Sequence, residues 1–374
     1  MTTGSAGTAG AAGKVLEAYL QDQATEFLRS LRLHRESTTD AQGAEESQEA
    51  ARSLRRAARR IGGTLHTFRP LLDQEWAASL RPELAWLSGT LAQEHAYATR
   101  LTRLLDALHR LSGPTPVPGP AEEPQTPAAP AVGRRSAGRG GSPLLERSRE
   151  LGGGWAQPEA ARGDTPGSTP RGLTVGAAKA AALLERQLTL ARTRAHSTAL
   201  QAFGSSRFHA VADNVAVLAS EVPLSNATDD LKRLAAKAEA DLAEAVSALP
   251  LGQAGHPYNA GALSHGLAPT DTAPDAQDAP WLKVRSLLRL HRYAQELLDL
   301  APPEPRITEA SHALDLHREA AAAAAAAAHA ARTPRIAPAT AYALGVLHAD
   351  QRHEVEAARF TFQQAWLHEA VSTR

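Results

Sequence analysis

Apolar residues recur at three- and four-residue spacing along most of the chain, outside two stretches rich in Pro and Gly. This spacing is the period of a helix with one buried face. No alternating run of β-branched and aromatic residues bounded by turn residues indicates a strand. We therefore predict an all-α protein. The predicted helices cover residues 14–36, 44–68, 73–111, 175–203, 206–218, 229–248, 280–300, 308–331 and 338–371, with a break near Pro82 left open.

The two stretches rich in Pro and Gly, at 113–172 and 250–279, divide the chain. Residues 1–13 and the linker 113–172 contain too few large apolar side chains to offset the entropy of ordering, so we predict that both are disordered. The first helical half is then 14–112, and the second is 173–374 with a loose insertion at 250–279. Two helical halves of comparable composition favour paired helical bundles.

A run of alanines from Ala320 to Ala328 has two interpretations. It is either a low-complexity expansion or a helix that packs very closely on a neighbour. Apolar residues flank the run on both sides, which favours the packed helix.

Charge and composition exclude several classes of protein. The 40 basic residues balance 40 acidic ones, so the whole molecule lacks the positive field of a general nucleic-acid binder. Cysteine is absent, which excludes disulfides and thiolate chemistry. No long apolar segment predicts export or a membrane span, and we expect a cytoplasmic protein.

One predicted helix carries a stripe of arginines. On a helical wheel Arg52, Arg55, Arg56 and Arg59 fall within a sector of roughly 100°, Arg60 borders it, and Gly63 and His66 extend it. No acidic residue occurs between residues 50 and 72, so carboxylates four residues away cannot neutralise the stripe. It is a solvated basic surface, a partner for acidic groups on neighbouring helices, or an anion site. Adjacent glycines at 62 and 63 indicate a close helix crossing or open space beside the arginines.

A weaker copy of this stripe lies in the second half of the chain. Arg285, Arg289 and Arg292 follow one another at spacings of four and three and share a helical face. Aligning Arg55 with Arg285 also aligns Arg59 with Arg289. This match suggests an internal duplication.

At these residues the sequence resembles the CHAD family, the conserved histidine α-helical domain. The segment RSLRRAARRIGGTLHTFRPLLD supplies Arg55, Arg59 and Arg60 of the first motif and its closing residues 68–71. The second motif is represented by Arg285, Arg289, Arg292 and Tyr293. Three further segments, EWAASLRPELAWLSGTLAQ, SSRFHAV and ALGVLHADQRHEVEAARFTFQQAW, resemble other helices of the family.

The resemblance implies two pseudo-symmetric four-helix bundles with a central basic groove or pore that accommodates inorganic polyphosphate. The sequence also departs from the family pattern. Arg52 and Leu282 replace the motif histidines, Gly62 and Leu290 stand where arginine is usual, and Ser286 where lysine is; His95 and Ala96 replace an Arg-Asp pair. These departures indicate a divergent member.

Other kinds of site find no support in the sequence. The 15 histidines include no His-Glu-x-x-His pattern, no glycine-rich phosphate loop follows a strand, and no nucleophile elbow occurs. The strand motifs of the triphosphate tunnel (CYTH) domain that often accompanies the family are absent. We therefore predict no catalytic residues, no metal and no cofactor.

The leading hypothesis is binding of inorganic polyphosphate without catalysis, in a basic groove lined by arginines from two helices. Association with polyphosphate granules would follow. The alternatives are a degenerate CHAD scaffold that binds a protein, which the missing histidines and zero net charge favour, and a nucleic-acid binder, which the scarcity of aromatic residues disfavours. The predicted site residues are Arg52, Arg55, Arg56, Arg59, Arg60, His66, Arg285, Arg289 and Arg292.

Overall fold

The computed structural model of the chain describes residues 4–37, 43–113, 171–225, 229–255, 274–299 and 304–372. These residues form helices joined by short turns, and the one β-type contact among them is an isolated bridge between Leu72 and Leu224. The prediction of an all-α protein is confirmed. The elements are α1 (Gly4–Ser37), α2 (Ala44–Thr67), the 3-10 turn η1 (Arg69–Leu71), α3 (Gln74–Ser112), α4 (Arg171–Phe203), α5 (Ser206–Ser220), α6 (Leu231–Ser247), α7 (Leu251–Ala254), α9 (Pro274–Leu297), α10 (Pro305–Ala331) and α11 (Pro338–Ser372).

Local signals set several helix ends. The Asp73 carboxylate accepts a hydrogen bond from the Trp76 backbone N–H at 2.8 Å and caps α3. Ser205 caps α5 in the same way through the Phe208 N–H at 3.1 Å. Helix α3 continues through Pro82 without a break and ends at Gly113, whose φ of 72° suits glycine.

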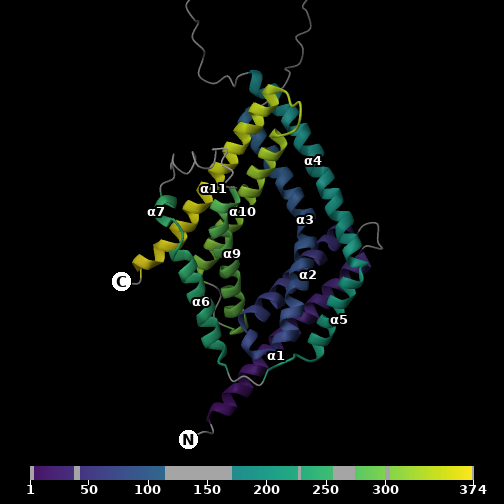
Figure 1. The fold of residues 1–374 in the computed structure, drawn as a ribbon, viewed down its shortest axis with the longest axis vertical. Helices are drawn as coiled ribbons and strands as arrows, with labels where there is room; N and C mark the ends of the chain where they lie inside the picture. The colour runs from purple at the N-terminus through teal and green to yellow at the C-terminus, as the bar shows by residue number, and fades with distance from the viewer. Residues whose placement is uncertain are drawn as a thin grey trace, which may run out of the picture.

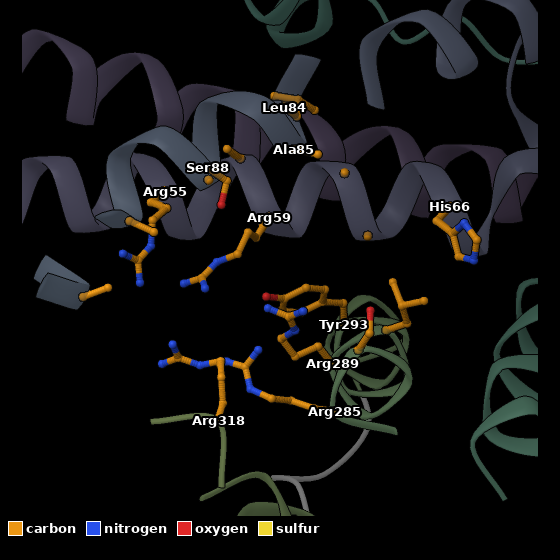
Figure 2. Close-up of a pocket in the computed structure, with 18 of the residues that line it drawn as sticks. Arg55, Arg59, His66, Leu84, Ala85, Ser88, Arg285, Arg289, Tyr293 and Arg318 are labelled. Carbon is orange, nitrogen blue, oxygen red and sulfur yellow. The ribbon is translucent and has the colours of Figure 1, made fainter. Parts of the chain in front are cut away.

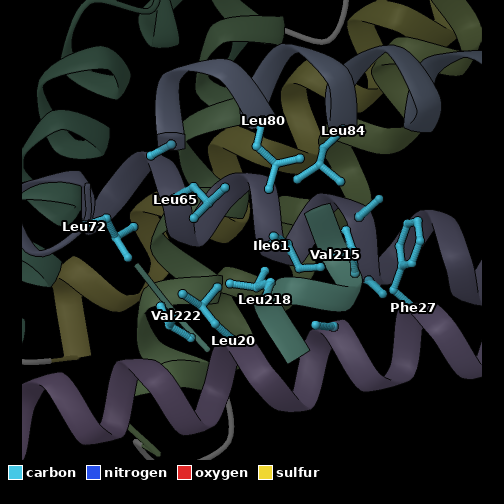
Figure 3. Packing of buried hydrophobic residues seen from close by; sticks show 14 of the residues in the cluster. Leu20, Phe27, Ile61, Leu65, Leu72, Leu80, Leu84, Val215, Leu218 and Val222 are labelled. Carbon is cyan, nitrogen blue, oxygen red and sulfur yellow. The ribbon is translucent and has the colours of Figure 1, made fainter. Parts of the chain in front are cut away.

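The first bundle consists of α1, α2, α3 and α5, which share one apolar core (Figure 3). Phe27 of α1, Ile61 of α2 and Val215 of α5 are each fully buried in it, and Leu84 of α3 is 1% exposed. Burying each such side chain contributes about 1.5–3 kcal/mol. The position of α5 corrects the predicted division of the chain, because residues 206–220 were assigned to the second half.

The second bundle consists of α6, α9, α10 and α11, with Trp281 and Phe362 in its core. A third apolar cluster joins the C-terminal half of α3 and helix α4 to α10 and α11. Alanines of the long alanine run lie in this cluster, where Ala323 and Ala327 are fully buried. The prediction of a closely packed helix is confirmed for this run.

The two bundles are therefore joined at two places, as Figure 1 shows. The third cluster joins them at one end of the molecule. At the other end Leu231 and Leu234 of α6 and Ala294 and Leu297 of α9 enter the core of the first bundle. These two junctions hold α9 beside α2 and α10 beside α3.

Three segments that were predicted to be loose or disordered differ from the prediction or lie partly outside the described residues. Helix α1 begins at Gly4, so residues 4–13, predicted to be disordered, are helical. The insertion predicted at 250–279 contains α7 and the first turns of α9, and its residues 256–273 lie outside the described residues, as do residues 114–170 of the predicted linker. None of the described helices has the length and apolar character that crossing a membrane requires.

Candidate functional site

A cavity of about 890 Å³ lies between the two bundles, lined by α2 and α3 on one side and by α9 and α10 on the other. Nine Lys or Arg side chains line it, against one carboxylate, that of Glu319. Figure 2 shows Arg55 and Arg59 of α2 pointing toward Arg285 and Arg289 of α9. A local excess of positive charge therefore exists in a chain whose net charge is zero.

Five of the predicted site residues line this cavity. They are Arg55, Arg59, His66, Arg285 and Arg289. The structure thus brings together the two arginine stripes that the sequence places more than two hundred residues apart. Gly63 explains how the helices approach so closely, because a Cβ atom at this position would lie 2.6 Å from Cδ2 of Tyr293.

The other four predicted residues do not line the cavity. Three of them form ion pairs with glutamates instead. Arg52 and Arg56 are exposed and donate hydrogen bonds to Glu49, at 3.1 and 2.7 Å. Arg60 donates to Glu296 of α9 at 2.8 Å. The expectation excluded only carboxylates four residues away. Glu49 lies just before the interval that lacks acidic residues, and it pairs at spacings of three and seven.

Arg292 is the fourth predicted residue outside the cavity lining. It is exposed on α9, next to Tyr293, which does line the cavity. Spacings of four and three keep three residues on one helical face, but that face is wider than the part of α9 that borders the cavity.

Several arginines inside the cavity lack a carboxylate partner among the residues that the structure describes. Among the described residues no carboxylate forms an ion pair with Arg55, Arg59 or Arg289, and the buried Nε atoms of Arg55 and Arg59 have no hydrogen-bond partner. Burial, followed by the nearby charges of Arg59, Arg318 and Arg285, lowers the pKa of Arg55 to about 10. Burial and the charge of Arg285 likewise lower the pKa of Arg289 to about 10. Both remain cations at neutral pH, at a cost in energy that a bound anion would relieve.

Other cavity arginines do have carboxylate partners, and Arg103 lies 3.5 Å from a carboxylate oxygen of Glu354. Arg285 and Arg318 are paired as well. Arg285 donates from Nε to Asp315 of α10 at 2.6 Å, and Arg318 donates to Glu319 at 3.1 Å. The Nε atom of Arg318 is buried without a partner. Both arginines therefore keep N–H groups available on a cavity wall that is already partly neutralised.

Sequence reasoning missed much of the cavity wall, mainly on α3 and α10 but also at one residue of α9. The cations that it did not identify are Arg81, Arg100, Arg103, Lys283 and Arg318. Burial also lowers the pKa of Arg100, although the nearby Tyr97 opposes this effect. Ser88 and His95, seven residues apart on α3, line the cavity too, and the interval of seven between Arg81, Ser88 and His95 was the signal that could have identified this face.

Residues 22–313 match the family model of the CHAD domain. The chain belongs to the CHAD domain family. A solved structure, PptA from Streptomyces chartreusis, is 56% identical in sequence, with a TM-score of 0.71; the match covers 95% of this chain and 99% of PptA. No curated protein matches the chain. The resemblance inferred from the arginine motifs is confirmed.

Five departures of this CHAD protein from the expected motifs lie in the cavity itself, and two of them, His95 and Ala96, are on α3. Gly62, Ser286 and Leu290 all line it. Leu282 is 41% exposed and does not line it. The substitutions at positions 62, 286 and 290 therefore change the chemistry of the cavity wall, and they make part of that wall neutral.

Proposed function

We propose that this CHAD protein binds inorganic polyphosphate in the cavity between its bundles and performs no chemistry on it. The observation that carries the proposal is that unpaired arginines of α2 and α9 face one cavity. A linear polyanion offers successive phosphate groups to successive guanidinium groups, and hydrogen bonds between charged groups contribute about 1.5–3 kcal/mol each. Binding would also remove the mutual repulsion of the arginines.

Arg55, Arg59 and Arg289 would make the principal contacts, because they have no carboxylate to displace. Arg285 would contribute through the N–H groups that Asp315 leaves available. His66 lies at one end of the cavity, where Arg81 donates to its Nδ1 atom at 2.8 Å. In the cell, such binding would place the protein in the cytoplasm, on polyphosphate granules.

The test is a binding titration with long-chain polyphosphate, single-stranded DNA and heparin over a series of salt concentrations. We expect binding that prefers polyphosphate and weakens as salt rises, because released counter-ions drive it. The double variant Arg55→Gln, Arg59→Gln should lower affinity about 100-fold, equivalent to about 3 kcal/mol.

The matched control is Arg52→Gln, Arg56→Gln. It removes the same charge from the same helix, but at exposed residues paired with Glu49. We expect its affinity to stay within about three-fold of the wild type, as for surface charges. Equal losses in both variants would indicate a diffuse surface effect and contradict a site in the cavity. No binding by the wild type at low salt would favour a protein-binding scaffold, and equal affinity for DNA would favour nucleic acid.

A further inference from the structure

The cavity contains a sector without charged groups. Along α2, Gly62 and Gly63 follow the arginines and precede His66. The neighbouring helices line this sector with aliphatic and aromatic groups, namely Ala78, Pro82 and Ala85 of α3 and Leu290 and Tyr293 of α9. We call these seven residues the neutral sector. Figure 2 shows Tyr293 between the cavity arginines and His66.

Bare phosphate groups do not suit the neutral sector. Phosphate oxygens that leave water need hydrogen-bond donors, and aliphatic walls provide none. An apolar group, in contrast, gains free energy by covering such walls. A ligand that fills the whole cavity therefore has a polyanionic end and a flat, largely apolar end.

We infer that the cavity takes nucleoside polyphosphates, with the phosphate chain on the arginines and the base in the neutral sector. The inference rests on the proposed function only for the phosphate chain, which the arginines would bind. A volume of about 890 Å³ lies within the range of roughly 300–1,000 Å³ that is usual for small-molecule sites, which are mostly apolar with a few polar groups.

Tyr293 of the neutral sector and the Arg81–His66 pair next to it suit a nucleobase in particular. Tyr293 is a partly exposed residue with an aromatic ring, and bases stack on such rings. The guanidinium carbon of Arg60 lies over this ring, 6.0 Å from its centroid. Arg81 and His66, linked by their 2.8 Å hydrogen bond, line the cavity beyond this sector. Arg81 keeps further N–H groups, which can donate to the ring nitrogens and carbonyl oxygens of a base.

The test compares ATP, tripolyphosphate and adenosine by calorimetry at one ionic strength with EDTA present. Tripolyphosphate carries the same number of phosphates as ATP and at least as much charge, so a purely electrostatic site would prefer it. We expect ATP to bind about five-fold more tightly or better, because stacking of one base contributes about 1–3 kcal/mol. Tripolyphosphate that binds as tightly as ATP overturns the inference.

A variant that fills the neutral sector sharpens the test. A Cβ atom at Gly62 would meet Leu84 Cβ at 3.9 Å, an ordinary contact, so Gly62→Leu is compatible with the fold and extends into the cavity. Gly345→Leu on α11 is the matched control, since nothing lies within 4 Å of a Cβ atom there and the residue does not line the cavity. We expect Gly62→Leu to remove the preference for ATP and to keep tripolyphosphate binding, whereas Gly345→Leu keeps both.

A preference for ATP that survives in Gly62→Leu overturns the inference. Tyr293→Leu provides a second variant, which should also reduce the preference. Failure of the two proposals can be distinguished. Wild-type protein that binds long-chain polyphosphate but binds ATP no better than tripolyphosphate supports the proposed function alone. Protein that prefers ATP and does not bind long-chain polyphosphate supports the nucleotide site alone.

Discussion

Replacing Arg289 by methionine should stabilise the protein when no ligand is present. The guanidinium of Arg289 is partly buried among Arg285 and Arg59, and burial lowers its pKa from the usual arginine value to about 10. That difference corresponds to about 3 kcal/mol at 1.36 kcal/mol for each pKa unit, an upper limit because the cavity still admits water. Methionine keeps the unbranched apolar stem and removes the charge. We therefore expect a gain of about 1–2 kcal/mol at low salt.

The sign of the pH dependence follows from the same shift. The folded pKa of Arg289 lies below the unfolded value, so the destabilisation is fully present below about pH 10 and disappears as pH rises toward the pKa of the unfolded arginine. At pH 7 the wild type carries the whole penalty. The methionine variant carries none of it.

Thermal unfolding at pH 7 measures the effect, with an expected rise of about 2–4 °C in Tm for each kcal/mol. The rise should shrink as salt screens the cavity charges. Arg292→Met, on the same helix but outside the cavity, is the control and should change stability by less than about 0.5 kcal/mol. An Arg289→Met protein that melts at or below the wild-type temperature at low salt would refute the reasoning. Added polyphosphate should stabilise the wild type more than the variant.

Three further predictions concern Asp315, Asp278 and the two cavity histidines. Asp315→Asn should raise polyphosphate affinity several-fold in a titration, because it frees Arg285 from its 2.6 Å partner; unchanged affinity would show that Arg285 does not contact the ligand. Asp278→Asn should lower the free energy of unfolding in urea by about 3–5 kcal/mol. The buried Asp278 carboxylate pairs with the buried arginines Arg352 and Arg359, at 2.9 and 2.6 Å. A smaller loss of stability would mean that these arginines find other partners. His66 and His95, whose pKa values burial and nearby arginines lower, should take up protons when an anion binds, so affinity should rise as pH falls from 8 to about 5.5. Calorimetry in two buffers measures this uptake, and the His66→Gln, His95→Gln variant should lose it.

Local signals explain why the helices were predictable. The apolar spacing that ends before Pro70 placed α2 within a residue of its observed end, and Asp73 marked the start of α3. The partner of each helix was not predictable in this way. The same apolar face of α5 could have packed in either half, and only the structure shows that Phe208 and Val215 enter the core beside α1 and α2.

The site was predictable only in part, for a similar reason. A helical wheel places Arg52 and Arg56 in the same broad sector as Arg55 and Arg59, and it cannot show which side of that sector meets another helix. In the structure Glu49 binds the exposed pair, Arg52 and Arg56, whereas Arg55 and Arg59 line the cavity. Arg100 and Arg318 lie on helices without an arginine stripe, so no local pattern distinguishes them from ordinary surface residues.

The two bundles are joined at both ends of the molecule. These two junctions explain how the fold tolerates arginines that face each other across the cavity. If the bundles met at one junction only, repulsion between the arginines of α2 and α9 would be relieved by opening the cavity. Apolar packing at the α3–α4–α10–α11 cluster and at the α6 and α9 residues in the first core opposes that opening. Arg55, Arg59 and Arg289 are thus held close to one another without a carboxylate partner among the described residues, and an anion that enters finds its donors already positioned. Such preorganisation saves the ordering cost that a flexible pair of bundles would incur on binding.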